Sequence, residues 1–91
     1  MKILLIEDEV ELLQSIRQYL EMEGNKVELA SDFAKAENKA ISYEYDCVLV
    51  DISIPGGNGI EIIRLLKQNK SKAGIIIISA KDSCFWFILL K

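Results

Sequence analysis

The stretch DCVLVDISIPGGNG, residues 46–59, decides the fold. Its apolar run ends abruptly at the carboxylate of Asp51, which is typical of a strand buried on both faces of a parallel sheet. Pro55 and the glycines after it predict a loop at the carboxyl end of that strand. Ligands bind at this edge of open α/β sheets, so Asp51 is placed to react or to hold a metal ion. The alternative is that Asp51 only terminates the strand.

Three more strands and three helices are predicted around this stretch. Residues 2–6 and 73–79 are continuous apolar strands, and residues 26–30 alternate like a strand at the sheet edge. Gly24 ends the first helix, Ser31 or Asp32 caps the second, and Asn58 caps the third, over about residues 59–69. The predicted apolar faces are Val10, Leu12, Leu13, Ile16, Tyr19 and Leu20; Phe33, Ala36 and Ala40 with Ile41 adjoining; and Ile60, Ile63 and Leu66 with Ile62 beside them. Strands alternating with helices predict a parallel sheet with right-handed crossovers.

Composition narrows the classes of function. The 91 residues form one domain, and 51% of them are hydrophobic, which is ample for a core and argues against disorder. A net charge of −3 without a large basic block argues against nucleic-acid binding by this chain alone. No apolar run reaches the roughly 20 residues that span a bilayer, and the start lacks a full signal peptide. We therefore expect a cytoplasmic location.

Carboxylates end the first and the third predicted strands. If these strands are neighbours in a doubly wound sheet, Glu7, Asp8 and Asp51 meet at one edge. Three close carboxylates either take up protons or bind a cation, and oxygen ligands with an open position suit Mg²⁺. Ser79 ends the fourth strand and can offer a hydroxyl to the same place. A carboxylate nucleophile, a divalent cation and a hydroxyl donor describe phosphoryl transfer to an aspartate.

At these residues the chain resembles the receiver domain of two-component response regulators. The resemblance rests on Ile3–Glu9 (ILLIEDE), on Val48–Asp51 (VLVD), on Pro55, Gly56 and Gly59 after the aspartate, and on Ile78–Ala80 (ISA). The resemblance covers residues 1–83, so it implies a truncated receiver. The motifs are specific when they are taken together. The segments PGGNG and ISAKDS are most similar to the branch of response regulators in which the receiver precedes a winged-helix DNA-binding domain. The resemblance implies a flavodoxin-like, three-layer α/β fold with strand order 2-1-3-4 and a signalling module rather than an enzyme.

The resemblance also implies a role for each matching residue. Asp51 would accept a phosphoryl group from a histidine kinase, and Ser79 would hydrogen-bond that group and report its presence. Mg²⁺ would be held by Asp8, Asp51 and the backbone carbonyl of Ser53, with Glu7 acting mostly through water. The kinase would dock on the helix after Asp8, around Leu12, Ser15 and Ile16.

The chain departs from the family after residue 83. Receivers continue with a fourth helix, a fifth strand that carries a lysine followed by proline, and a fifth helix. Pro55 is the only proline of this chain, so that pair is absent from it, and neither Lys81 nor Lys91 stands at the required distance from Ser79. Residues 84–91 (CFWFILLK) form an atypical apolar tail instead. We expect the loss of the lysine to impair signalling.

The tail also predicts self-association. Without the fifth strand, residues 75–78 would form a long apolar edge, which can pair with another chain. Only residues 80–83 join this edge to the tail, and four residues are too few for a parallel crossover. The tail therefore either runs back as an antiparallel strand or forms a short helix capped by Asp82 or Ser83. Its aromatic and branched residues favour the strand. Either arrangement predicts a homo-oligomer, formed through the tail or the sheet edge.

The sequence leaves three alternatives to a receiver to consider. A phosphatase of the haloacid-dehalogenase type needs a second acid two residues after the nucleophile, where Ser53 stands. A flavodoxin-like flavin binder needs a phosphate loop after the first strand, where residues 7–9 are acidic and would repel a phosphate. The remaining alternative is a non-signalling remnant or interaction domain with an idle site, and the sequence does not separate it from a working receiver.

Overall fold

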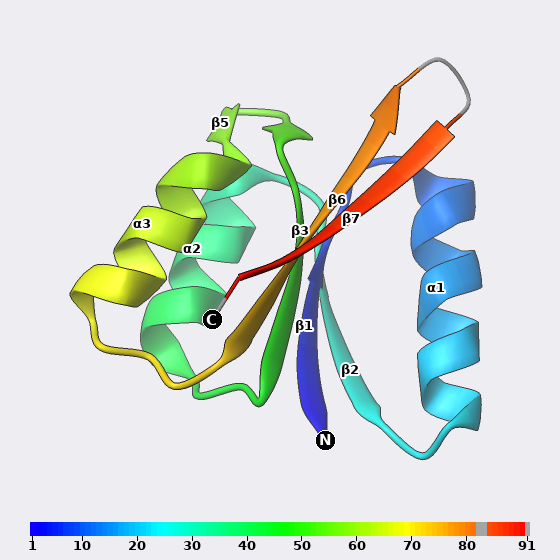
Figure 1. Cartoon of the computed structure of the whole chain (residues 1–91), viewed down its shortest axis with the longest axis horizontal. Helices are drawn as coiled ribbons and strands as arrows, with labels where there is room; N and C mark the ends of the chain where they lie inside the picture. The colour runs from blue at the N-terminus through cyan, green and yellow to red at the C-terminus, as the bar shows by residue number, and fades with distance from the viewer. Residues whose placement is uncertain (82–83, 91) are drawn as a thin grey trace.

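A five-stranded sheet forms the centre of the molecule (Figure 1). The computed structural model describes the backbone of residues 1–81 and 84–90, and the side chains of residues 1–78. The strands of this sheet are β1 (Lys2–Ile6), β2 (Lys26–Ala30), β3 (Cys47–Asp51), β6 (Gly74–Lys81) and β7 (Cys84–Leu90). Their order is β2-β1-β3-β6-β7, and the first four run parallel. The predicted order 2-1-3-4 and the flavodoxin-like α/β class are therefore confirmed.

Helices cover both faces of the sheet and make three layers. The helices are α1 (Val10–Met22), α2 (Phe33–Ser42) and α3 (Gly59–Gln68). Helices α2 and α3 lie side by side on one face, and α1 lies on the other (Figure 1). The predicted helix ends are confirmed: Asp32 and Asn58 cap α2 and α3 by accepting backbone N–H bonds, and Gly24 has a left-handed φ of 90°. Among the described residues, no helix is both long enough and apolar enough to cross a membrane.

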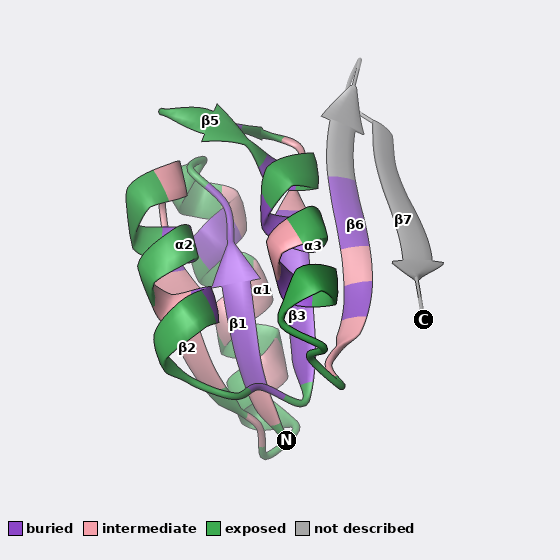
Figure 2. Cartoon of the chain, turned by 90° about the vertical axis from the view of Figure 1, so that its left-hand side faces the viewer, coloured by how far each residue is buried: buried purple, intermediate pink, exposed green. Residues whose placement is uncertain are grey.

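The parallel sheet separates two groups of buried side chains. Strands β1 and β3 are buried almost throughout (Figure 2), because helices lie over both of their faces. The group under α2 and α3 includes Leu4, Ile6, Val48, Val50, Ile62 and Leu66. The group under α1 includes Ile3, Leu5, Leu13, Leu49 and Ile78. These two groups pack on the two faces of β1 and β3, and the backbone pairing of the strands sets the register of their carboxyl ends.

Some residues of the predicted helix faces point into solvent instead. Ile60 is exposed and Ile62 is fully buried, so the predicted face of α3 was wrong at Ile60. Val10 and Tyr19 flank the line of α1 that packs on the sheet and are exposed, and Ile41 is exposed on α2. In the described part of the chain, α1 is the only helix on its face (Figure 1), so its flanks have no neighbouring helix to cover them.

The loop after β3 contains a small hairpin that the sequence did not predict. Two-residue strands β4 (Ser53–Ile54) and β5 (Gly57–Asn58) pair antiparallel across a turn at Pro55–Gly56. Gly56 takes a φ of 85° in this turn, which glycine adopts without strain. The hairpin places Asn58 at the start of α3 and projects beyond the carboxyl edge of the sheet (Figure 1).

The apolar tail forms the last strand of the sheet. Strand β7 runs antiparallel to β6, with Ser79 opposite Trp86 and Ile75 opposite Leu90. The antiparallel alternative for the tail is thus confirmed and the helical one is wrong, because strand pairing satisfies the backbone groups along β6. Asp82 and Ser83, the predicted helix caps, lie outside the described residues.

Candidate metal and phosphoacceptor site

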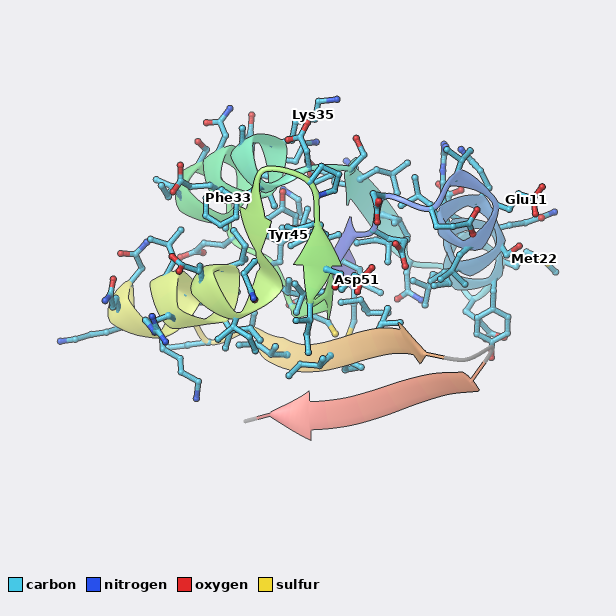
Figure 3. The ribbon with its side chains drawn as sticks, turned by 90° about the horizontal axis from the view of Figure 1, so that it is seen from above. Glu11, Met22, Phe33, Lys35, Tyr45 and Asp51 are labelled. Atoms are coloured by element: carbon cyan, nitrogen blue, oxygen red, sulfur yellow. The ribbon has the colours of Figure 1, made fainter. Side chains whose placement is uncertain are left out.

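The register of β1 and β3 brings two carboxylates together. Ile6 pairs with Val50, so the next residues, Glu7 and Asp51, follow at neighbouring positions of the carboxyl edge. One oxygen each from Glu7, Asp8 and Asp51 lies within 4.8 Å of the other two. The structure therefore brings together the three carboxylates that the sequence placed at this edge (Figure 3 labels Asp51).

Glu7 is the buried member of the site. Its side chain is only 2% exposed, and Oε2 accepts hydrogen bonds from the backbone N–H groups of Asp8 (2.8 Å) and Glu9 (3.1 Å). Burial and the nearby Asp51 carboxylate raise the pKa of Glu7 from 4.5 to about 7, although the two N–H groups oppose the shift. A cation at this position would relieve the repulsion.

Asp8 and Glu9, which follow Glu7, have different tasks. Asp8 is exposed and its carboxylate belongs to the cluster. Glu9 is the N-cap of α1, since its carboxylate accepts hydrogen bonds from the N–H groups of Glu11 (3.2 Å) and Leu12 (2.8 Å). The acidic stretch thus supplies two carboxylates to the site and one to the helix.

Asp51 is held by the loop that follows it. The carboxylate is half-buried, and Oδ1 accepts a hydrogen bond from the backbone N–H of Ser53 (3.1 Å). Gly59, at the start of α3, donates its N–H to the carbonyl of Ile52 (2.8 Å) and lies against the backbone of Asp51. The orientation of the Asp51 carboxylate therefore depends on the hairpin and on the start of α3.

The other predicted residues lie on the elements expected for them. Ser79 belongs to β6 and follows Ile78, which pairs with Asp51. The side chain of Ser79 is not among those that the structure describes. Leu12, Ser15 and Ile16 lie on α1, where Ser15 is exposed and the other two are half-buried. Their roles remain predictions.

Sequence reasoning missed the pairing of Phe33 and Gly57, which pack against each other where the β4–β5 hairpin meets the start of α2 (Figure 3 labels Phe33). The sequence predicts Phe33 only as part of the apolar face of its helix. The available signal was the second glycine after Pro55, since glycine often marks a close approach of two segments.

A comparison with protein families matches the chain to the "Response regulator receiver domain" over residues 3–88. The chain belongs to this family. It is a receiver module rather than an enzyme with its own substrate, and the match includes the first part of β7.

Curated relatives agree with the family match. The chain is 40% identical over 84 residues to the response regulator ArlR of Staphylococcus saprophyticus, covering 92% of this chain and 38% of ArlR. It is 35% identical over 80 residues to the transcriptional regulatory protein ResD of Bacillus subtilis, covering 88% of this chain and 33% of ResD. The chain thus spans between a third and two fifths of the length of these two relatives.

A solved structure shows the same fold. The response regulator TrrA of Thermotoga maritima, in complex with Mg²⁺-BeF, superposes with a TM-score of 0.82 at 31% identity. The likeness covers 89% of this chain and 70% of the TrrA chain. The Mg²⁺ named for TrrA fits the chemistry of the oxygen donors at Glu7, Asp8 and Asp51 in this chain.

Proposed function

We propose that Asp51 accepts a phosphoryl group from a histidine kinase in a Mg²⁺-dependent reaction. The observation that carries the proposal is the strand register that places Glu7, Asp8 and Asp51 within 4.8 Å of one another in a chain of the receiver family. The location that fits this role is the cytoplasm. The name of ResD, a transcriptional regulatory protein, supports a place for such a domain in transcription regulation.

The residues divide the work as follows. A carboxylate oxygen of Asp51 attacks the phosphorus, the phosphorus–nitrogen bond to the kinase histidine breaks, and the imidazole nitrogen keeps the bonding electrons. Asp8, Asp51 and the backbone carbonyl of Ser53 would hold Mg²⁺, with Glu7 acting mostly through water. When bound, the cation neutralises charge on the phosphoryl oxygens. The N–H of Ser53 orients Asp51, and the Ser79 hydroxyl would bond the transferred group.

Helix α1 is the surface we propose for the kinase. It starts two residues after Asp8, so a partner that lies along it reaches Asp51. Ser15 is exposed there, and Leu12 and Ile16 are half-buried, so the proposed docking surface is partly apolar. The exposed Val10 and Tyr19 on the flanks of α1 enlarge that surface.

We propose that transfer is slow in this 91-residue chain. A lysine ammonium near the phosphoryl oxygens would supply preorganised charge worth roughly 2–4 kcal/mol. The Lys-Pro pair that carries it in receivers is not within these residues. An idle site is the alternative outcome.

Incubation with acetyl phosphate and Mg²⁺, followed by intact mass, tests the proposal. We expect partial labelling that requires Mg²⁺ and disappears in Asp51→Asn. Labelling that persists in D51N would reject Asp51 as the acceptor. No labelling of wild type over hours would favour the idle domain, and fast stoichiometric labelling would show that another group replaces the lysine.

We also propose that the chain self-associates through strand β7. It is the end strand of the sheet in the described residues, and the sequence CFWFILL contains no charge and no proline that would discourage pairing. The simplest partner is a second copy, which can present the same edge across a two-fold axis.

A further inference from the structure

Phe33, the first residue of α2, ties that helix to the loop that follows the phosphoacceptor. Its backbone N–H donates to the carbonyl of Pro55 (2.9 Å), at the turn of the β4–β5 hairpin. Its half-buried side chain packs against the core group under α2 and α3. The contact therefore joins a fixed element of the core to the tip of the loop.

Gly57 leaves the space that the Phe33 side chain fills. A β-carbon at residue 57 would lie 2.5 Å from both Cγ and Cδ2 of Phe33 and 3.0 Å from Cβ. Because the crowding extends to Cβ, rotation of the ring alone would not remove it. Gly57 has no left-handed φ, unlike Gly56, so space rather than backbone conformation calls for glycine here.

The hairpin transmits this contact to Asp51. Gly57 pairs with Ile54, and Asn58 pairs with Ser53, so the position of Gly57 fixes the backbone of Ser53. The Ser53 N–H in turn holds Oδ1 of Asp51. A shift of the hairpin away from Phe33 would move both the orienting N–H and the carbonyl expected to bind the metal.

We propose that Phe33 is a positioning residue for the Asp51 site and acts through its contact with Gly57. The proposal rests on the proposed function for its effect on Mg²⁺ binding and phosphorylation. Its structural part, that the Phe33–Gly57 contact fixes the hairpin, stands independently and has its own test.

Phe33→Ala removes the contact and leaves the catalytic carboxylates intact. Removal of a group that orients metal ligands lowers metal affinity about tenfold in comparable sites, and we expect a loss of that order for Mg²⁺ by calorimetric titration. Phe33→Leu keeps an apolar side chain at this place and should restore most of the affinity. Leu65→Ala is the matched control, because Leu65 packs on the same core group from α3, seven residues after Asn58 at the end of the hairpin. It should lower stability without changing the Kd for Mg²⁺.

Gly57→Ala tests the same contact from the other side. It should weaken Mg²⁺ binding by pushing the hairpin away from α2. The double variant F33A/G57A should bind Mg²⁺ better than G57A alone, because the two closest atoms of Phe33 are then absent. Simple additivity of the two losses would overturn the proposal.

Hydrogen exchange at the Gly59 amide separates this proposal from the proposed function. That amide closes the loop onto Ile52, so F33A should speed its exchange while L65A leaves it unchanged at equal global stability. Unchanged exchange in F33A, or an unchanged Kd for Mg²⁺, would overturn the positioning role. If wild type binds no Mg²⁺, the proposed function fails, and the exchange measurement still decides whether Phe33 fixes the loop. Should F33A fail to fold, Phe33→Val gives the same comparison.

Discussion

Gly59 lies so close to Asp51 that a β-carbon at residue 59 would stand 2.2 Å from the Asp51 carbonyl oxygen. The obstacle is backbone, which cannot rotate away as a side chain can. Gly59→Ala must therefore displace either the start of α3 or the phosphoacceptor. We expect a loss of about 1–3 kcal/mol in the free energy of unfolding, measured with urea, and weaker labelling of Asp51.

Gly74→Ala is the control for this variant. A β-carbon at Gly74 would meet only the Asp46 carbonyl oxygen, at an ordinary 3.9 Å. We expect this variant to unfold like wild type. Equal losses in G59A and G74A would show that general glycine replacement, and not the approach to Asp51, lowers stability.

The raised pKa of Glu7 predicts a pH dependence of stability in the absence of metal. The pKa rises from 4.5 to about 7 on folding, so the folded state holds this proton more tightly than the unfolded state does. The corresponding stability is full below pH 4.5 and is lost as the pH rises toward 7. Urea denaturation with chelator, compared between wild type and Glu7→Gln, isolates this contribution. A difference between the two proteins that does not change with pH would contradict the prediction.

Mg²⁺ should stabilise the folded chain at neutral pH. A ligand that binds only the folded state adds about 2.7 kcal/mol at a hundredfold excess over its Kd. Thermal melts with and without millimolar Mg²⁺ measure this gain. Asp8→Asn should abolish the shift, whereas Asp46→Asn should retain it, because Asp46 lies at the opposite end of β3 and accepts the Lys2 N–H there. If Mg²⁺ leaves the melting temperature of the wild type unchanged, the carboxylate cluster is not a metal site.

Lys70 predicts an easy gain of stability outside the site. It follows the end of α3 with a φ of 56°, a left-handed conformation that glycine adopts without strain. Lys70→Gly should raise the free energy of unfolding by about 0.5–1 kcal/mol. Lys70→Ala keeps the strain and removes the same charge, so it should show no such gain; equal stability of the two variants would refute the explanation.

The strands and the carboxylate cluster were predictable from the sequence for a physical reason. Residues buried on both faces of a sheet must be apolar, so the runs before Glu7 and Asp51 identified two buried strands, and the parallel pairing placed both carboxylates at one edge. Asn58 marked the start of α3 because few side chains can accept the free N–H groups there.

The rotation of the helices was harder to predict. Apolar residues occur at positions 60, 62, 63, 65 and 66, so hydrophobicity alone defines no single face of α3. In the structure the start of α3 lies close against the backbone of Asp51, Ile62 is buried and Ile60 is left in solvent. The Phe33–Gly57 contact was not predicted because it joins segments far apart in the chain, and no local pattern marks which residues of the two segments meet.

Strand β7 predicts that the chain associates at concentrations where a receiver with a covered edge would stay monomeric. In the described residues β7 pairs with β6 on one side and ends the sheet on the other. Its seven residues include no charge, proline or glycine, so the usual protection of an edge strand is absent.

Static light scattering across a dilution series should show the mass fall from dimer toward monomer. Removal of residues 84–91 should change the association state, and so should Ile88→Lys, which adds a charge to the strand and leaves its backbone pairing with β6 possible. A monomer at high micromolar concentration would refute the idea, and a dimer unaffected by I88K would place the interface on another surface, such as the exposed flank of α1 with Val10 and Tyr19.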